Sequence, residues 1–563
     1  MEKRVFLAIF LSFVVLAVYQ AYFAPPPVKP APPAATTAAP VGSTPPAAAA
    51  SGATAPVPPA PQAVPLVSDI AARDIVVETD AVQAVFSTAG GTLRSWKLKN
   101  YREDGRPLEL VPSEIPDTYS KPFTLSTNDA TLSKTLAAAL FQPSADHLSL
   151  GSAPGTLTFQ YRDASGLSAR KTFNFQPEGK AYLMKVEASV DLGGASRPVT
   201  LAWGPALGLG YSPDGSRTLP ARAIQYRDTK VERLSASALE KQSRYEGALR
   251  FAGSEDQYFI SAVVPGTERI VIEYQPITLP VPRDPKGGSR TFVGYTVSVP
   301  GSLNLPYFIG PKDFDVLRAV DTQLVRAIDF GMFAWLVVPL LQALKWVNSY
   351  AHNYGWAIVI LTVIINLLIF PLRHRSMVSA KKMQALQPEM KAIQERYAKY
   401  KLTDPERQKM NQETMALYKQ KGVNPVSGCL PMLLTFPILF AFYALLSAAI
   451  ELRGAPFAGW IHDLSRHDPY YVMPLLMGVT QFAQMRMMPS TADPMQQRIM
   501  MLMPIIFTVS FIKAPSGLAL YWFVSNLLAI GQQTLTNRLV AAPVRSKPPT
   551  RARAGTNGGG GKA

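Results

Sequence analysis

Residues 356–372 read WAIVILTVIINLLIFPL, and a basic segment, residues 373–421, follows directly. Only Thr362 and Asn366 are polar within the apolar run. Because these two side chains lie four residues apart, they fall on one face of a helix. The basic segment holds twelve Lys/Arg and five Asp/Glu. An apolar helix with one polar stripe and a positively charged extension indicates a membrane protein that handles a polar group inside the bilayer.

The composition of the whole chain agrees with a membrane protein of several domains. The chain has 563 residues, 48% of them hydrophobic, and a mean hydropathy of +0.08. This length predicts two or three domains. The net charge of +17 is compatible with nucleic acid, anionic lipid or loops that set membrane topology. The single cysteine, Cys429, excludes an intrachain disulfide, and we expect it to be a small buried hydrophobe.

The N-terminus predicts a membrane anchor followed by a spacer. Lys3 and Arg4 precede an apolar run that is long enough to span a bilayer, and three prolines follow it. A cleaved signal peptide would need a shorter run and a small-x-small site, so we interpret residues 1–23 as an uncleaved anchor. Residues 24–65 hold fourteen prolines and one charged residue. They predict a semi-rigid, partly polyproline II linker.

Residues 66–312 predict an all-β sandwich outside the cytoplasm. Short alternating runs such as DIVVE at 74–78 and GTLTFQY at 155–161 are separated by turn clusters. His147 is the only histidine in this region, and the sequence shows no metal-ligand spacing and no glycine-rich phosphate loop. A sugar-processing sandwich needs general acid–base residues. A binding or spacer role is therefore favoured over catalysis, with no cofactor.

Residues 313–350 predict an interfacial amphipathic region. The apolar stretch 333–347 is of borderline length for a span, and Pro339, Gln342 and Lys345 interrupt it. If this stretch crossed the membrane, the basic segment 373–421 would lie outside the cell, against the positive-inside rule. We therefore expect a helix lying on the outer membrane surface.

The basic segment 373–421 predicts a cytoplasmic helical hairpin. Apolar residues follow spacings of three and four up to Tyr400, and Pro388 should kink the first helix or divide it in two. Thr403 to Glu406 reads as a capping box for a second helix. The hairpin could dock anionic lipid, ribosomal RNA or an acidic partner. The candidate docking residues are Arg373, Arg375, Lys381, Lys382, Lys391 and Arg396.

Four further apolar segments complete a core of five helices, which gives six spans with the N-terminal anchor. They cover about 430–450, 470–488, 499–512 and 516–531. The third is short, which predicts a locally thinned bilayer or a re-entrant segment. Residues 541–563 predict a basic disordered tail, and both termini should be cytoplasmic. Polar side chains inside the spans are either helix–helix contacts or the lining of a wet groove. The groove candidates are Thr362, Asn366, Thr435, Tyr521 and Ser525.

Several motifs resemble the YidC/Oxa1/Alb3 family of membrane protein insertases, in its long Gram-negative form. They include NPVSGCLP at 424–431, ELRGAPF at 451–457, WIHDL at 460–464, DPMQQ at 493–497 and PSGLALY at 515–521. Weaker matches are Ala89 to Gly91 and YFIGPK at 307–312. The resemblance implies an inner-membrane protein with a groove open to cytoplasm and lipid. It also implies a periplasmic super-sandwich, similar to galactose-mutarotase-like folds, without enzymatic activity.

The resemblance further implies binding partners, and this chain differs from the family pattern at one groove position. Its substrates would be nascent membrane proteins, and its partners would include the Sec translocon, ribosomes and membrane lipids. The family usually carries an arginine in the groove, where this chain has Asn366. Asparagine hydrogen-bonds but carries no charge, which argues against charge-based recruitment here and leaves a hydrated groove.

The leading hypothesis is therefore membrane protein insertion without catalytic residues or metal, and two alternatives stay open. A small-solute transporter would show repeats and intramembrane acids, and neither is seen in the central spans. An envelope scaffold or sugar-binding module would not need five further spans. The predicted organisation is anchor 1–23, linker 24–65, β-sandwich 66–312, interfacial region 313–350, insertase core 351–540 with hairpin 373–421, and tail 541–563.

Overall fold

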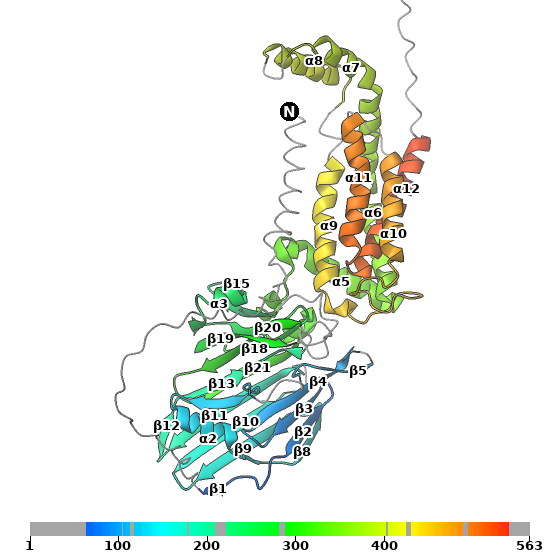
Figure 1. Ribbon diagram of the computed structural model, residues 1–563. Helices are drawn as coiled ribbons and strands as arrows, with labels where there is room; N and C mark the ends of the chain where they lie inside the picture. Colours follow the sequence, from blue (N-terminus) through cyan, green and yellow to red (C-terminus); the bar gives the residue numbers. More distant parts are fainter. Residues whose placement is uncertain are drawn as a thin grey trace, which may run out of the picture. The chain divides into compact units, whose positions relative to one another are not determined.

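The computed structural model consists of a β-rich part followed by a helical part (Figure 1). It describes residues 64–103, 105–112, 118–176, 180–208, 221–280, 288–400, 404–423, 430–487 and 494–539. The predicted anchor, nearly all of the linker, Cys429 and the basic tail lie outside these ranges, so those interpretations stay predictions. The expectation of a β domain followed by a helical core is confirmed.

The β-rich part contains one large sheet of eleven strands. Its strands are β1 (Pro65–Val67), β7 (Gln142–Pro143), β9 (Gly155–Asp163), β10 (Leu167–Phe175), β11 (Leu183–Leu192), β12 (Ala195–Arg197), β14 (Arg222–Arg227), β15 (Lys230–Leu234), β17 (Phe251–Glu255), β18 (Phe259–Val263) and β21 (Leu303–Pro311). Their order is β1-β9-β10-β11-β21-β18-β17-β14-β15, with β12 beside β11 and β7 beside β9. Every pair in this sheet is antiparallel, as the alternating sequence patterns predict.

Two five-stranded sheets accompany the large sheet. One contains β6 (Thr124–Thr127), β13 (Val199–Trp203), β16 (Arg244–Ala248), β19 (Arg269–Pro280) and β20 (Ser289–Ser298), in the order β16-β19-β20-β13-β6. The other contains β2 (Asp74–Thr79), β3 (Val82–Ser87), β4 (Thr92–Glu103), β5 (Arg106–Glu109) and β8 (His147–Gly151), in the order β5-β4-β3-β2-β8. The pair β2 and β8 is parallel. Short helices α2 (Ala130–Ala138) and α3 (Ala236–Leu239) lie between strands.

Aromatic side chains join the sheets into one core. The rings of Phe86 on β3 and Phe173 on β10 have centroids 4.6 Å apart. The indole of Trp96 on β4 donates to the carbonyl of Ile309 on β21, at 3.0 Å. These contacts bury one face of each sheet, which is how alternating strands are stabilised.

The helical part begins after β21 with short elements and then long helices. Its short elements are α4 (Phe314–Val320), η3 (Leu324–Ala327), η4 (Gly331–Phe333) and η6 (Ile450–Leu452). Its longer helices are α5 (Ala334–Ala351), α6 (Tyr354–Ala385), α7 (Gln387–Arg396), α8 (Glu406–Gln420), α9 (Leu430–Ala448), α10 (Val472–Met487), α11 (Pro494–Phe511) and α12 (Ser516–Leu539). Within the described ranges, α6 is the one helix long and apolar enough to cross a membrane, and shorter apolar stretches are Phe436–Ala448 and Met501–Phe511.

Helix α6 carries the polar stripe and continues without a break into the basic segment. The side chain of Asn353 caps its first turn by accepting from the backbone N–H of Trp356, at 3.1 Å. The helix ends at Ala385, and Pro388 lies in the first turn of α7. Of the two outcomes that Pro388 allowed, the chain shows the division into two helices, because proline fits a first turn but not a helix interior.

Three helices have bounds that differ from the sequence predictions. Helix α8 begins at Glu406, where the carboxylate of Asp404 accepts from the Glu406 backbone N–H, at 3.0 Å. Thr403, the predicted cap, lies outside the described residues. Helix α11 starts at Pro494 and has 18 residues, so it is longer than the predicted 499–512 segment. Helix α12 continues to Leu539 instead of ending near 531, because the polar residues of its last turns bond to neighbouring helices.

The helical part is apolar on its outside. Large hydrophobic side chains are exposed on several of its helices. They include Ile360, Ile364, Leu367 and Leu368 on α6, Phe440 and Tyr443 on α9, Leu475 and Val479 on α10, and Leu502, Ile505, Ile506 and Val509 on α11. Surface of this extent marks contact with lipid or another protein, and it fits helices that lie in a membrane.

Candidate functional site

The polar stripe on α6 is built from two side chains that bond along their own helix. The Thr362 hydroxyl, fully buried, donates to the carbonyl of Ile358, at 2.6 Å. The Asn366 side-chain N–H donates to the carbonyl of Thr362, at 2.8 Å. These bonds satisfy the donors locally and leave the side-chain carbonyl oxygen of Asn366 free to accept from another group.

That second group is Arg373, which the sequence places among the docking residues. Its Nη1 donates to Oδ1 of Asn366, at 2.9 Å. The two residues are seven apart, close to two helical turns, so they share one face of α6. Arg373 is half-buried. Among the residues that the structure describes, no carboxylate pairs with Arg373.

Two of the other predicted groove residues lie on α12, which packs against α6. Tyr521 is buried, and its ring stacks on Phe442 of α9 with centroids 4.2 Å apart. Ser525 follows one turn later, and its buried hydroxyl makes no hydrogen bond of ordinary geometry with the described residues. Thr435 belongs to α9, and its side chain lies outside the described set. The structure thus brings Asn366 and Arg373 together, places Tyr521 against Phe442 of α9, and leaves Thr435 untested.

Polar residues of α12 that the sequence analysis did not select connect it to both neighbours. The side chain of Gln532 donates to the carbonyl of Phe370 on α6, at 3.2 Å. Gln533 reaches the carbonyl of Met487 on α10, at 3.0 Å. The Thr536 hydroxyl lies 3.1 Å from Nδ1 of His374. The four-residue spacing of Gln532 and Thr536 on one helix face is the signal that could have indicated this role.

The remaining candidate docking residues do not form one surface. Lys381 donates to the carbonyl of Thr536, at 3.3 Å, and Arg396 pairs with Glu413 of α8, at 2.9 Å. Arg375, Lys382 and Lys391 are exposed. Helices α7 and α8 lie together around a small cluster of Leu386, Tyr418 and Val423. The hairpin is thus held by its own contacts, and four of the six candidates are exposed, counting Arg396, whose charge is paired with Glu413.

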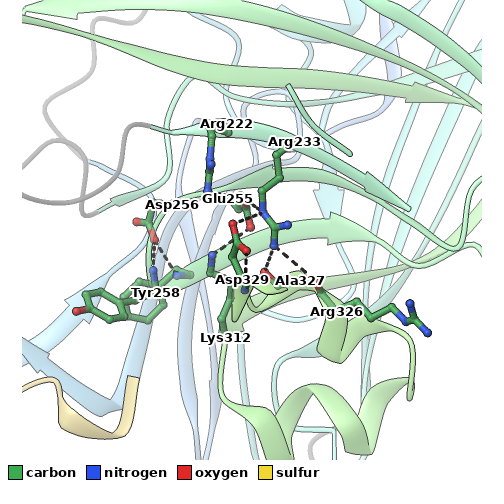
Figure 2. A network of polar contacts seen from close by, with 11 residues as sticks. Arg222, Arg233, Glu255, Asp256, Tyr258, Lys312, Arg326, Ala327 and Asp329 are labelled. Carbon is green, nitrogen blue, oxygen red and sulfur yellow. Dashed lines mark hydrogen bonds and ion pairs between the residues drawn. The ribbon is translucent and has the colours of Figure 1, made fainter. Parts of the chain in front are cut away.

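The β-rich part contains a second set of buried charges (Figure 2). Glu255 is fully buried, and three cations surround it: Lys312 at 3.1 Å, Arg233 at 2.9 Å and Arg222 at 3.4 Å. Arg233 also donates to the carbonyl of Ala327, at 2.8 Å. The cluster therefore fixes η3 to the end of the large sheet.

Comparisons with known proteins agree on one family. A family model described as 60Kd inner membrane protein matches residues 346–543, and one described as YidC periplasmic domain matches residues 74–343. Membrane protein insertase YidC of Geobacter metallireducens is 40% identical, covering 96% of this chain and 99% of the relative. Its counterpart in Syntrophus aciditrophicus is 35% identical, covering 96% and 100%. This chain belongs to the YidC family.

Membership of the YidC family confirms several of the expectations from sequence. The relatives are membrane protein insertases, which confirms the expectation that the chain is not an enzyme. The two matched models confirm an inner-membrane protein with a periplasmic domain. A solved structure of an active YidC insertase with its first transmembrane domain resolved is 19% identical, with a TM-score of 0.33, and covers 84% of this chain and 95% of that chain.

One motif of the resemblance, Ala89 to Gly91, surrounds a buried lysine. Lys171 Nζ donates to the carbonyls of Gly90 and of Phe123, the latter at 2.9 Å. Gly91 has a φ of +56°, and a Cβ placed on it would meet Lys171 Cε at 3.0 Å. Only glycine fits both the conformation and the space. Burial lowers the pKa of Lys171 to about 7.

The motifs at 307–312 and 451–457 each end or begin with a paired charge. Lys312 is the partner of Glu255. Glu451 accepts from Lys345 of α5, at 2.9 Å, and Lys345 also donates to Asp315, at 2.7 Å. Burial opposes the charge on Lys345, but these carboxylates raise its pKa above the ordinary value. Both motifs thus act as structural connections in this member of the YidC family.

Proposed function

We propose that this chain inserts nascent membrane proteins into the bacterial inner membrane through a polar groove between its central helices. The groove is defined by Thr362, Asn366, Thr435, Tyr521 and Ser525. One observation supports it above the others: the helical part has polar side chains inside and large apolar side chains outside. Polar side chains inside membrane-spanning helices cost free energy to desolvate, so their presence typically marks a functional site.

The groove would act by hydrating the polar segment of a substrate while its apolar helix leaves sideways into lipid. The exposed apolar residues of α11 are where that helix would pass. Its burial in lipid supplies the driving force, at about 0.8 kcal/mol for each CH₂ group. No covalent step is needed.

The proposed topology has six spans, with the N-terminal anchor, α6, α9, α10, α11 and α12 crossing the bilayer. Both termini and the hairpin α7–α8 are cytoplasmic in this proposal. Helix α5 lies on the periplasmic surface, supported by the exposure of Trp335 and Trp346 opposite its buried face. The domain bounds 1–23, 24–65, 66–312, 313–350, 351–540 and 541–563 belong to the same proposal.

The partners would be nascent membrane proteins, the Sec translocon, ribosomes and membrane lipids. The exposed cations Arg375, Lys382 and Lys391 support docking of an anionic partner to the hairpin. Replacing all three by glutamine should weaken co-sedimentation with ribosomes and make the remaining binding less sensitive to salt. Unchanged binding at every salt concentration would remove the hairpin from this role.

A photocrosslinker tests the groove directly. Placed at Asn366 it should trap a stalled single-span substrate, while at Leu368 it should trap lipid instead. Leu368 is the matched control because it lies on the same helix, two residues away, with 73% of its surface exposed. Equal substrate adducts at both positions, or none at Asn366, would contradict insertion through the groove.

A further inference from the structure

We propose that a cationic hollow of the β-rich part binds the phosphate of an anionic glycerophospholipid in the outer leaflet of the membrane. The hollow has a volume of about 380 Å³, and its lining includes Arg250, Arg326, Thr229 and Gln323. We call it the η3 hollow, after the short helix that forms one wall. The proposal goes beyond insertion, and it takes from the proposed function only the position of α5 on the periplasmic membrane surface.

The η3 hollow lies where the hairpin of β14 and β15 meets η3. The hydroxyl of Tyr226 on β14 donates to Oε1 of Gln323, the residue that precedes η3, at 3.3 Å. Arg233 on β15 donates to the carbonyl of Ala327, the last residue of η3, at 2.8 Å. Because η3 is bonded to the hairpin at both of its ends, the walls of the hollow are fixed by the fold.

The two arginines of the η3 hollow keep their N–H donors for a ligand. Within the described ranges, neither Arg250 nor Arg326 forms an ion pair, and neither side chain donates a hydrogen bond. Cζ of Arg326 lies 5.5 Å from the centre of the Tyr226 ring, and such stacking leaves the edge of the guanidinium open. Figure 2 shows Arg326 extending away from the Glu255 cluster.

The remaining lining groups are compatible with an anion. Asp228 is the acidic residue among them, and its Oδ2 lies 3.8 Å from Nε of Arg227. Its side chain is 92% exposed, so water screens its charge. Thr229 supplies a hydroxyl, and Gln323 supplies side-chain N–H donors because its oxygen already accepts from Tyr226. Two guanidinium groups and neutral donors match the oxygens of a phosphate, which only accept.

The position of the η3 hollow along the chain favours a lipid over a soluble phosphate. Met332 follows Arg326 after six residues, which span at most about 21 Å when extended. Met332 is 82% exposed and Trp335, at the start of α5, is 70% exposed. Exposed apolar and tryptophan side chains on a surface helix lie at the level of the lipid headgroups. The arginines of the hollow are therefore within reach of the phosphate layer.

A photocrosslinker in the η3 hollow tests the proposal. The full chain carries benzoylphenylalanine in place of Ala248, an exposed lining residue without a polar side chain. It is placed in nanodiscs of equimolar phosphatidylglycerol and phosphatidylcholine, and mass spectrometry identifies the lipid adducts. Adducts of phosphatidylglycerol should outnumber those of phosphatidylcholine about fivefold.

Substitution of the two arginines should remove this preference. In Arg250→Gln combined with Arg326→Gln, the ratio of the two adducts should fall to about one, because the groups that bind phosphate are gone. The matched control is Arg162→Gln combined with Arg170→Gln, which removes two exposed arginines from β9 and β10. It should keep the ratio of the unsubstituted chain, since the net charge changes equally in both variants.

Inorganic phosphate distinguishes the two sources of the ligand. A ratio near one in the unsubstituted chain, together with calorimetric binding of sodium phosphate with a Kd below about 1 mM, would assign the hollow to a soluble anion and overturn the proposal. Absence of lipid adducts, or a preference that survives loss of both arginines, would overturn it as well. Insertion is measured separately by the crosslink at Asn366, so failure here leaves the proposed function standing.

Discussion

The β-rich part and the helical part treat a buried cation in opposite ways. In the β-rich part, Lys312 and Arg233 share the carboxylate of Glu255. In the helical part, Arg373 donates a hydrogen bond to the neutral amide of Asn366, and no described carboxylate pairs with it. The Glu255 cluster thus neutralises its cations internally, whereas Arg373 has no carboxylate partner among the described residues.

The difference follows from what each region has to do. An unpaired buried charge costs a folded domain several kcal/mol, and the Glu255 cluster avoids that cost. A membrane groove that receives charged substrate segments needs an uncompensated group that substrate can satisfy. Substitutions that remove the carboxylate from the Glu255 cluster, or that give Arg373 a carboxylate, test this comparison.

The largest effect is expected from removing the shared carboxylate of the β domain. Glu255→Gln leaves Arg222, Arg233 and Lys312 around a neutral amide, which should lower the free energy of unfolding by about 3–5 kcal/mol. Urea unfolding of the full chain in detergent, followed by the fluorescence of buried Trp96 and Trp203, measures it. Glu246→Gln on β16 changes an exposed glutamate and is the control. A loss as small as that of the control would mean that the cluster is not structural.

The second effect concerns Lys171, a buried cation that has only carbonyl partners. Its pKa in the folded chain is lowered to about 7 by burial, against 10.5 ordinarily. Between these values the unfolded chain binds more protons, so the free energy of unfolding should rise with pH, by up to about 1.4 kcal/mol for each pH unit.

Lys171→Met should remove this rise, since methionine does not titrate. Unfolding measured at pH 7 and pH 9 gives the slope for both proteins. Lys185→Met, on the adjacent strand β11, should keep the slope of the unsubstituted chain. If Lys171→Met keeps it as well, Lys171 is charged throughout and its carbonyl contacts compensate it fully.

The third effect comes from giving Arg373 the partner that cations of the β domain have. Asn366→Asp places a carboxylate where the amide accepts from Arg373 and turns that hydrogen bond into an ion pair. Insertion of an acidic substrate should slow about tenfold, which is 1.4 kcal/mol in the barrier. A neutral substrate in the same proteoliposomes is the control. Undiminished insertion of the acidic substrate would show that compensation of Arg373 is irrelevant.

The sequence predicts the layout of this molecule better than the state of its charges. Alternating runs such as Leu183–Leu192 and the apolar run of α6 follow from periodicity, so the β-rich and helical parts could be predicted. The division at Pro388 follows from backbone chemistry. Helix ends such as Leu539 could not be predicted, because bonds to other helices decide them.

The site itself was half predictable. Thr362 and Asn366 are visible as a stripe, and Tyr521 follows from its motif. The position of Arg373 directly after the apolar run predicts a cytoplasmic docking residue, and the structure adds that its side chain donates to Asn366 within that run. Periodicity predicts which helix face a residue occupies, but it does not predict that the Arg373 side chain extends about two turns along the helix to Asn366.

The smallest effect is expected from releasing Arg373 without neutralising it. Asn366→Ala removes the amide that holds the guanidinium but keeps the charge on α6. The acidic substrate should therefore be inserted about twofold to threefold more slowly. This corresponds to an increase of about 0.4–0.7 kcal/mol in the activation barrier, well short of the increase expected for Asn366→Asp. If alanine proves as damaging as aspartate in the same assay, position matters more than charge. In that case Asn366, and not Arg373, is the group that substrates meet.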